Sequence, residues 1–206
     1  KDNKLRCWGA ISLMFTGLDL IQADKDGREK TVQYLKDSVT FVKELDGEVM
    51  SIVPSEVGKV RAQADPKTEW KWAVQGLKEV YAHAQKEGIK IAIEPLNRFE
   101  AYLLNTVDQA IAYADRVGGD GIGILYDTFH ANIEEKDPLG ALHAAYAKGH
   151  VNHVHISEND RGTPGRGHAK IRETIGALRA LGYDGWMTIE AFGRANATQF
   201  DDRGFA

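Results

Sequence analysis

The chain has 206 residues, of which 43% are hydrophobic and 27% charged, with a formal net charge of −4 and a single cysteine, Cys7. This composition is typical of one globular domain. The acidic net charge argues against nucleic acid or a membrane surface as a partner. A single thiol excludes an internal disulfide and a metal site made of several cysteines. No apolar run approaches the roughly 20 residues of a membrane-spanning helix, and we expect a cytoplasmic protein.

Short apolar runs alternate with longer amphipathic segments along the chain. The runs are rich in Ile, Val and aromatic residues, which is typical of strands buried on both faces of a parallel sheet. In chain order they are Leu5–Met14, Glu48–Val53, Ile89–Ile93, Ile122–Tyr126, Val151–Ile156 and Trp186–Ile189. Apolar stripes and capping signals predict helices over Arg28–Leu45, Glu69–Lys86, Thr106–Arg116, Pro138–Lys148 and Ile171–Leu181.

This strand–helix alternation predicts one α/β domain over residues 1–206, of the TIM (β/α)8 barrel type. A complete barrel of this kind has eight strands and takes about 250 residues, whereas about six strands are visible here. We therefore expect either a barrel that lacks two βα units or an unusual shortened barrel. An open barrel would leave two unpaired strand edges.

Four of the predicted strands end at a side chain that can bind a metal ion. These side chains are Glu94, Asp127, His155 and Glu190, separated by about 30 residues, the length of one βα unit. Because the C-terminal ends of barrel strands form one rim, we expect the four to meet there. Such an oxygen-rich set suits Mn²⁺, Mg²⁺ or Co²⁺, and a cation would relieve the repulsion among the carboxylates. We predict that His153, on the same strand face as His155, is a hydrogen-bonded core residue.

Three sequence motifs point to a known family. They are NRFE at Asn97–Glu100, DTFHANIEE at Asp127–Glu135 and HISENDRG at His155–Gly162. Together they resemble ketose 3-epimerases of the D-tagatose and D-psicose (allulose) type, which are sugar isomerases and epimerases with a xylose isomerase-like TIM barrel. The resemblance covers residues 88–193 closely and the preceding part only in pattern.

The resemblance implies a barrel whose first two βα units precede the segment seen here. It implies that the four strand-end residues bind one divalent cation, Mn²⁺ in the first place, and that Glu94 and Glu190 form the catalytic acid–base pair. It also implies that Glu100, His130 and Arg161 contact the hydroxyls of a small sugar, and that the protein is a homo-oligomer, either a dimer or a tetramer. We expect His130 in the loop after the fourth strand.

The chemistry expected is proton abstraction next to a carbonyl through a metal-bound enediolate. Inversion requires one base on each face of the sugar, since a single base would tend to restore the original configuration. Several alternatives stay open. A dehydratase of the inosose dehydratase kind and a C-glycoside-cleaving lyase begin with the same proton abstraction. An AP endonuclease shares the barrel but needs further zinc ligands and a basic DNA face, and an inactive or complemented barrel fragment would not turn over sugar.

Overall fold

The computed structural model describes residues 3–12, 14 and 17–192, in which strands and helices alternate as predicted. In chain order the elements are β1 (Gly9–Ser12), α1 (Lys25–Glu44), β2 (Val49–Ile52), α2 (Pro66–Glu87), β3 (Lys90–Ile93), α3 (Val107–Val117), β4 (Ile122–Asp127), α4 (Thr128–Glu134), α5 (Pro138–Ala147), β5 (Val151–Ile156), α6 (Ile171–Leu181) and β6 (Met187–Ile189). Each predicted strand and helix is present, and only α4 was not predicted. Within the described ranges, no helix is both long and apolar enough to cross a membrane.

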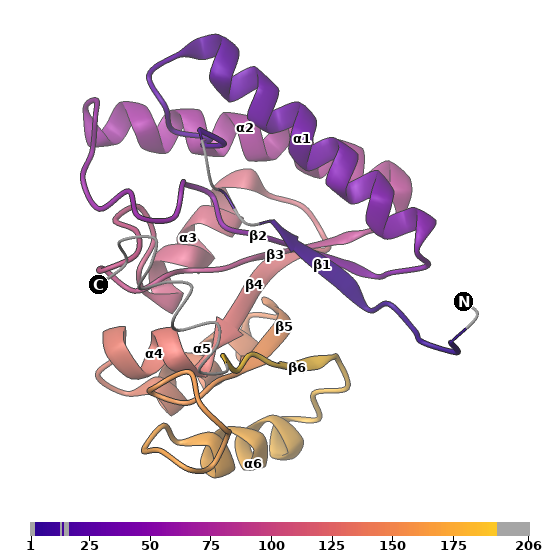
Figure 1. The fold of residues 1–206 in the computed structure, drawn as a ribbon, viewed down its shortest axis with the longest axis vertical. Coiled ribbons are helices and arrows are strands. Elements are labelled where there is room, and N and C mark those ends of the chain that lie inside the picture. Colours follow the sequence, from indigo (N-terminus) through magenta and orange to yellow (C-terminus); the bar gives the residue numbers. More distant parts are fainter. Residues whose placement is uncertain (1–2, 13, 15–16, 193–206) are drawn as a thin grey trace.

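All six strands are parallel and follow the order β1-β2-β3-β4-β5-β6 in one sheet. The sheet curls into part of a barrel, with α1 and α2 on the convex side at the N-terminal half and α5 and α6 at the C-terminal half (Figure 1). In the described part of the chain, β1 and β6 each pair with one neighbour only. The fold is therefore the incomplete TIM-type barrel that the sequence predicts.

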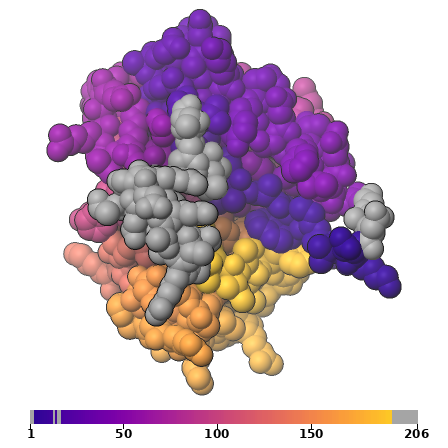
Figure 2. Space-filling view, in the orientation of Figure 1, coloured from indigo at the N-terminus to yellow at the C-terminus, as the bar shows by residue number. Residues whose placement is uncertain are grey.

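Side chains of the N-terminal segment pack beside β6 without strand pairing. Figure 2 shows the indigo N-terminal segment next to the yellow C-terminal segment, and the Arg6 guanidinium lies 4.9 Å from the centre of the Trp186 ring. Trp8 stacks on His153 of β5, with 3.8 Å between ring centroids. Large side chains thus fill space between the two edges of the sheet.

The core has two parts because successive strand residues point to opposite faces of the sheet. A large cluster between sheet and helices contains, among others, Ile52, Ile93 and Ile124. A small cluster on the inner face contains Val49, Ala92 and Leu125. By the same alternation, the residues two positions after Ala92 and Leu125 also face inward, at the C-terminal end of the strands.

Capping residues mark the first or last turn of several helices close to the predicted bounds. Thr106 and Gln109 form a capping box at the start of α3, the first residue of the helix predicted over Thr106–Arg116 being its N-cap. Asp137 caps α5 directly before Pro138, and Gly182 adopts a φ of 77° after the last residue of α6. These caps satisfy backbone groups that the helix ends leave unpaired, which allows short connections to the strands.

Helix α4 corrects the expectation of a loop after β4. It begins directly at Thr128, because Asp127 is both the last residue of β4 and the N-cap of α4, and its side chain accepts the Phe129 N–H at 2.8 Å. His130 therefore lies in the first turn of a helix rather than in a loop. A strand that continues directly into a helix leaves no Gly- or Pro-containing turn for sequence reasoning to detect.

The last residue of α4, Glu134, and its C-cap, Glu135, both make contacts with other segments. The Glu134 carboxylate pairs with the Arg98 guanidinium at 2.7 Å, and its side chain is only 2% exposed. Glu135 accepts the backbone N–H of Val107 at 2.7 Å. The first contact ties the end of α4 to the NRFE segment after β3, and the second ties it to the first residue of α3.

Gly123 in β4 provides a test of the sheet packing. A Cβ atom at this position would lie 2.2 Å from the backbone oxygen of His150, so Gly123→Ala forces the backbone between β4 and β5 to move. We expect a loss of about 1–3 kcal/mol in the free energy of unfolding, measured by urea denaturation. Gly176→Ala in α6 is the matched control, because a Cβ there meets nothing within 4 Å. This control should gain about 0.5–1 kcal/mol, and an equal response of both variants would contradict the packing argument.

Candidate metal centre

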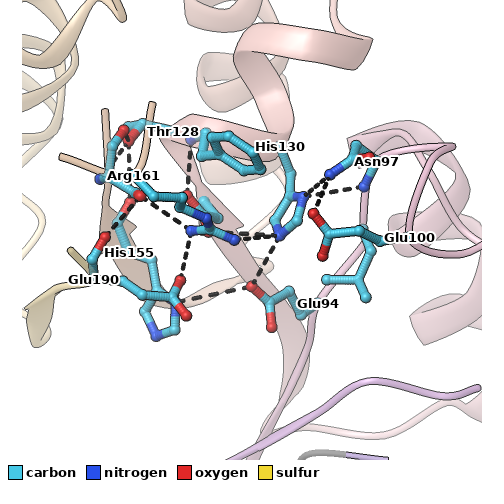
Figure 3. A network of polar contacts seen from close by, with 12 residues as sticks. Glu94, Asn97, Glu100, Thr128, His130, His155, Arg161 and Glu190 are labelled. Atoms are coloured by element: carbon cyan, nitrogen blue, oxygen red, sulfur yellow. Dashed lines mark hydrogen bonds and ion pairs between the residues drawn. The ribbon is translucent and has the colours of Figure 1, made fainter. Parts of the chain in front are cut away.

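The four side chains at the strand ends meet at the C-terminal edge of the sheet. Glu94 follows β3, Asp127 ends β4, His155 lies in β5 and Glu190 follows β6. Figure 3 shows Glu94, His155 and Glu190 close together. One ligand atom from each lies within 4.8 Å of those of the other three. Glu94 and His155 are 3% exposed and Asp127 is 4% exposed. The four side chains therefore lie together at the C-terminal ends of the strands, as the sequence predicts.

Burial and the neighbouring charges shift the pKa values of the three carboxyl groups in the cluster. Burial, followed by the negative charges of Asp127 and Glu190, raises the pKa of Glu94 well above its usual value. Burial also raises the pKa of Asp127 to about 6, although the Arg161 charge opposes this. Burial alone would raise the pKa of Glu190 as well, but the hydrogen bond with His155 and the Arg161 charge hold it at about 2.

The Arg161 guanidinium lies inside this cluster. Its Nη1 donates to Asp127 Oδ2 and to Glu190 Oε2, both at 2.7 Å. The guanidinium carbon also lies 4.0 Å from the centre of the Phe129 ring. The backbone of Arg161 has a φ of 56°, an uncommon conformation for a residue with a side chain. Arg161, expected only to contact substrate, thus supplies a positive charge to two of the carboxylates.

His130 and Glu100 lie on one side of the cluster and are joined by Asn97. The Asn97 backbone N–H donates to His130 Nδ1 at 3.0 Å, and its Nδ2 donates to Glu100 Oε1 at 2.7 Å (Figure 3). His130 Nε2 lies 2.9 Å from Arg161 Nη2 and 3.8 Å from Glu94 Oε1. Burial, with the Arg161 charge, lowers the pKa of His130 well below its usual value, which leaves the ring neutral. The three expected substrate contacts are therefore grouped beside the carboxylates.

Two further residues at this site were not singled out from the sequence. Asn97 is 1% exposed and links His130 to Glu100. Ser157 is fully buried, accepts from Arg161 Nη1 at 3.0 Å and donates to the backbone oxygen of Glu190 at 2.7 Å. Both stand inside the NRFE and HISENDRG motifs, which is the signal that could have identified them.

A family model described as "xylose isomerase-like TIM barrel" matches residues 1–203. The chain belongs to this family. A probable ketose 3-epimerase of Synechocystis sp. is 36% identical over 177 residues, which cover 85% of this chain and 61% of that protein. L-ribulose 3-epimerase of Mesorhizobium japonicum is 34% identical over 185 residues, which cover 89% and 61%.

Two solved structures of sugar 3-epimerases are similar in fold to this chain. D-psicose 3-epimerase with D-tagatose from Clostridium cellulolyticum H10 is similar at a TM-score of 0.82 and 29% identity, covering 89% of this chain and 64% of the other. A structure of L-ribulose 3-epimerase gives a TM-score of 0.84 at 29% identity, covering 94% and 66%. This chain thus spans less than two thirds of the length of the curated relatives described above.

The residues of this family member fit a divalent cation. Three carboxylates and one imidazole offer ligand atoms within 4.8 Å of one another. Hard oxygen donors with one nitrogen are the set that Mn²⁺, Mg²⁺ and Co²⁺ accept. The Arg161 guanidinium, which contacts Asp127 and Glu190, shows that the cluster accommodates a positive charge. The buried cluster can therefore bind a divalent metal ion.

His153 is the buried core residue that the sequence predicts, and it should make the fold sensitive to acid. It is fully buried and its Nε2 lies 3.0 Å from Thr188 Oγ1, while burial lowers its pKa to about 3. Because the unfolded chain binds this proton near pH 6.5 and the folded chain does not, the contribution of His153 is complete above pH 6.5 and is lost as pH falls. We expect it to remove about 2 kcal/mol between pH 6.5 and pH 5.

Urea unfolding at pH 7 and pH 5, in the presence of a chelator, measures this loss. The His153→Gln variant is the control, since glutamine cannot take up the proton. Its free energy of unfolding should fall less steeply with pH than that of the unsubstituted protein, whatever its absolute stability. The same pH dependence in both proteins would rule out His153 as the source.

Proposed function

We propose that the protein is a divalent-metal-dependent ketose 3-epimerase that inverts the carbon next to the carbonyl of a small sugar. The observation that carries the proposal is the convergence of Glu94 and Glu190 with Asp127 and His155 on one centre. The 34–36% identity to proteins named as ketose and L-ribulose 3-epimerases supports the same reaction. The chain spans 61% of the length of each of these two proteins.

The metal ligands in this proposal are Glu94, Asp127, His155 and Glu190. A divalent cation bound there, for which we favour Mn²⁺ over Mg²⁺ and Co²⁺, would act as a Lewis acid that stabilises negative charge on the sugar oxygens. Glu94, Asp127 and His155 are buried, whereas Glu190 is partly exposed, and the burial of the first three strengthens electrostatic interactions at the site.

The two glutamates divide the proton transfer between them. One carboxylate removes the proton from C3, which gives an enediolate, and the other carboxyl group returns a proton to the opposite face of the same carbon. No atom is gained or lost, and the roles exchange in the reverse direction. Glu94 and Glu190 extend from the ends of different strands, β3 and β6, which supports a role for each on its own face of the substrate.

Three polar side chains beside the cluster would orient the sugar. Arg161 and Glu100 offer a donor and an acceptor, and the neutral His130 ring has Nε2 directed toward Arg161 at 2.9 Å. Because Asn97 holds both His130 and Glu100, these two groups present a fixed geometry to the substrate hydroxyls. Preorganised polar groups of this kind lower the entropic cost of aligning the reacting carbon.

The proposal is tested by solvent-deuterium exchange with a panel of ketoses. Metal-loaded protein should incorporate one deuterium at C3 of D-fructose, D-psicose, D-tagatose or L-ribulose and form the C3 epimer. Release of water would instead support the dehydratase alternative, and release of an aglycone from a C-glycoside would support the lyase. Nuclear magnetic resonance of the products distinguishes these outcomes directly.

A second candidate is an inactive or complemented barrel, which is favoured because the outer edges of β1 and β6 pair with no strand among the described residues. Metal binding without turnover of any ketose, together with a co-purifying partner chain, would support it. A homo-oligomer and a cytoplasmic location also stay predictions, and the mass in solution measured by light scattering tests the first of them.

A further inference from the structure

The connection from β5 to α6 places Arg161 in the site but has no helix or strand of its own. Residues 157–170 run between the two elements as turns and bends. In its first half, the Arg161 N–H donates to the Glu158 backbone oxygen at 3.0 Å, and the Arg161 oxygen accepts the Phe192 N–H at 2.7 Å. Neither contact explains how the rest of the loop is held.

The side chain of Glu158 holds both halves of this loop. It is 1% exposed, and its Oε2 accepts the N–H of Asn159 at 3.2 Å and of Ala169 at 3.1 Å. Its Oε1 accepts the N–H of Gly165 at 2.9 Å. One carboxylate therefore takes hydrogen bonds from backbone positions on each side of Arg161, with charge-assisted strength.

The loop is closely fitted around this carboxylate. The Asn159 side chain adds a parallel contact, since its Oδ1 accepts the His168 N–H at 2.7 Å. A Cβ atom at Gly167 would lie 2.5 Å from Glu158 Oε2 and 2.1 Å from Asn159 Oδ1. Glycine is thus required where the returning half of the loop passes over the two side chains.

We propose that Glu158 is a positioning residue, whose carboxylate fixes the 157–170 loop so that the Arg161 guanidinium lies against Asp127 and Glu190. The inference rests on the proposed function, in which Arg161 binds the sugar. It assigns to Glu158 a role through Arg161 and no contact with the substrate. Displacement of an orienting group by about 1 Å costs up to about 100-fold in rate.

Glu158→Gln is the sharpest substitution, because it preserves size while replacing one acceptor oxygen with an NH₂ group. Whichever way the amide is turned, a donor then faces a backbone N–H of the loop. We expect kcat/KM for the best ketose to fall about 10- to 100-fold. Glu173→Gln on the exposed face of α6 is the charge-matched control and should leave kcat/KM unchanged.

A double-mutant cycle with Arg161→Gln separates positioning from general stability. If Glu158 acts through Arg161, Glu158→Gln should change kcat/KM by less than about twofold once Arg161 is already glutamine. A loss of the same size in both backgrounds would overturn the proposal, because it would show that Glu158 acts on the fold as a whole.

The second readout needs no activity, so it separates this inference from the proposed function. Mn²⁺ affinity of the metal-free protein is measured by calorimetry across the same four proteins. Arg161 forms hydrogen bonds with oxygens of Asp127 and Glu190 that would otherwise be free to bind the ion. Glu158→Gln, which should release Arg161 from them, is therefore expected to tighten Mn²⁺ binding at least about twofold. The same substitution should have no such effect in the Arg161→Gln background. If the unsubstituted protein turns over no sugar, the proposed function fails while this cycle still decides the role of Glu158. Equal Mn²⁺ affinity in Glu158→Gln and the unsubstituted protein would overturn the positioning role of Glu158.

Discussion

Replacing Glu94 or Glu190 by glutamine should lower the rate of epimerisation by roughly 10²–10⁴-fold. Glutamine keeps the size of the side chain and one oxygen that can contact a cation, but it can neither accept nor return a proton at the sugar carbon. Because each glutamate serves one face of the substrate, loss of either one should block the reaction in both directions. The rate is measured per metal-loaded site with the ketose that reacts best.

Metal content decides how a loss of rate in these variants is interpreted. Both variants should retain some bound metal, since three of the four ligands are unchanged. Glu44→Gln, at an exposed position at the end of α1, is the control for removal of one negative charge and should retain full activity. Full activity of Glu94→Gln or Glu190→Gln would contradict the scheme with two bases.

The layers of the fold could be predicted because the signals are local. Each buried parallel strand is a short apolar run, and each helix carries a stripe or a cap within its own residues, such as Thr106 with Gln109. The sequence also indicated the incomplete barrel, since six runs cannot supply eight strands. Helix α4 escaped prediction because Asp127 ends a strand and caps a helix at once, so no turn separates the two.

The metal cluster could be predicted for a topological reason. In a parallel sheet with strands in sequence order, residues at corresponding positions of successive βα units become neighbours, as Glu94 and Asp127 do. The resemblance to ketose 3-epimerases then added Glu100, His130 and Arg161, which lie beside the cluster.

The position of the Arg161 guanidinium could not be derived from the sequence. It depends on a positive φ at a residue other than glycine and on contacts with Asp127 and Glu190, which lie 34 and 29 residues away. The loop that carries it has no periodicity, because Glu158 organises it through backbone hydrogen bonds that leave no pattern in side-chain type. Residues that act through backbone contacts are the ones that composition and spacing do not reveal.

Addition of Mn²⁺ to the metal-free protein should raise its free energy of unfolding by about 2.7 kcal/mol at a concentration 100 times the dissociation constant. The physical reason is that the folded chain holds Glu94, Asp127 and Glu190 together against their mutual repulsion, which raises the pKa of Glu94. The unfolded chain separates these groups and has no comparable site. Urea unfolding with and without chelator measures the difference, and parallel titrations with Mg²⁺ and Co²⁺ rank the three ions.

Asp127→Asn should abolish most of this stabilisation at the same Mn²⁺ concentration. The substitution removes one negative ligand but keeps an oxygen that can accept the Phe129 N–H, so the cap of α4 is preserved. Asp37→Asn, on the exposed face of α1, removes the same charge away from the cluster and should retain the full response. If Mn²⁺ stabilised Asp127→Asn as strongly as the unsubstituted protein, the cation would have to bind elsewhere. The four strand-end residues would then lose their assignment as its ligands, since a true ligand cannot be removed without weakening the site that it forms.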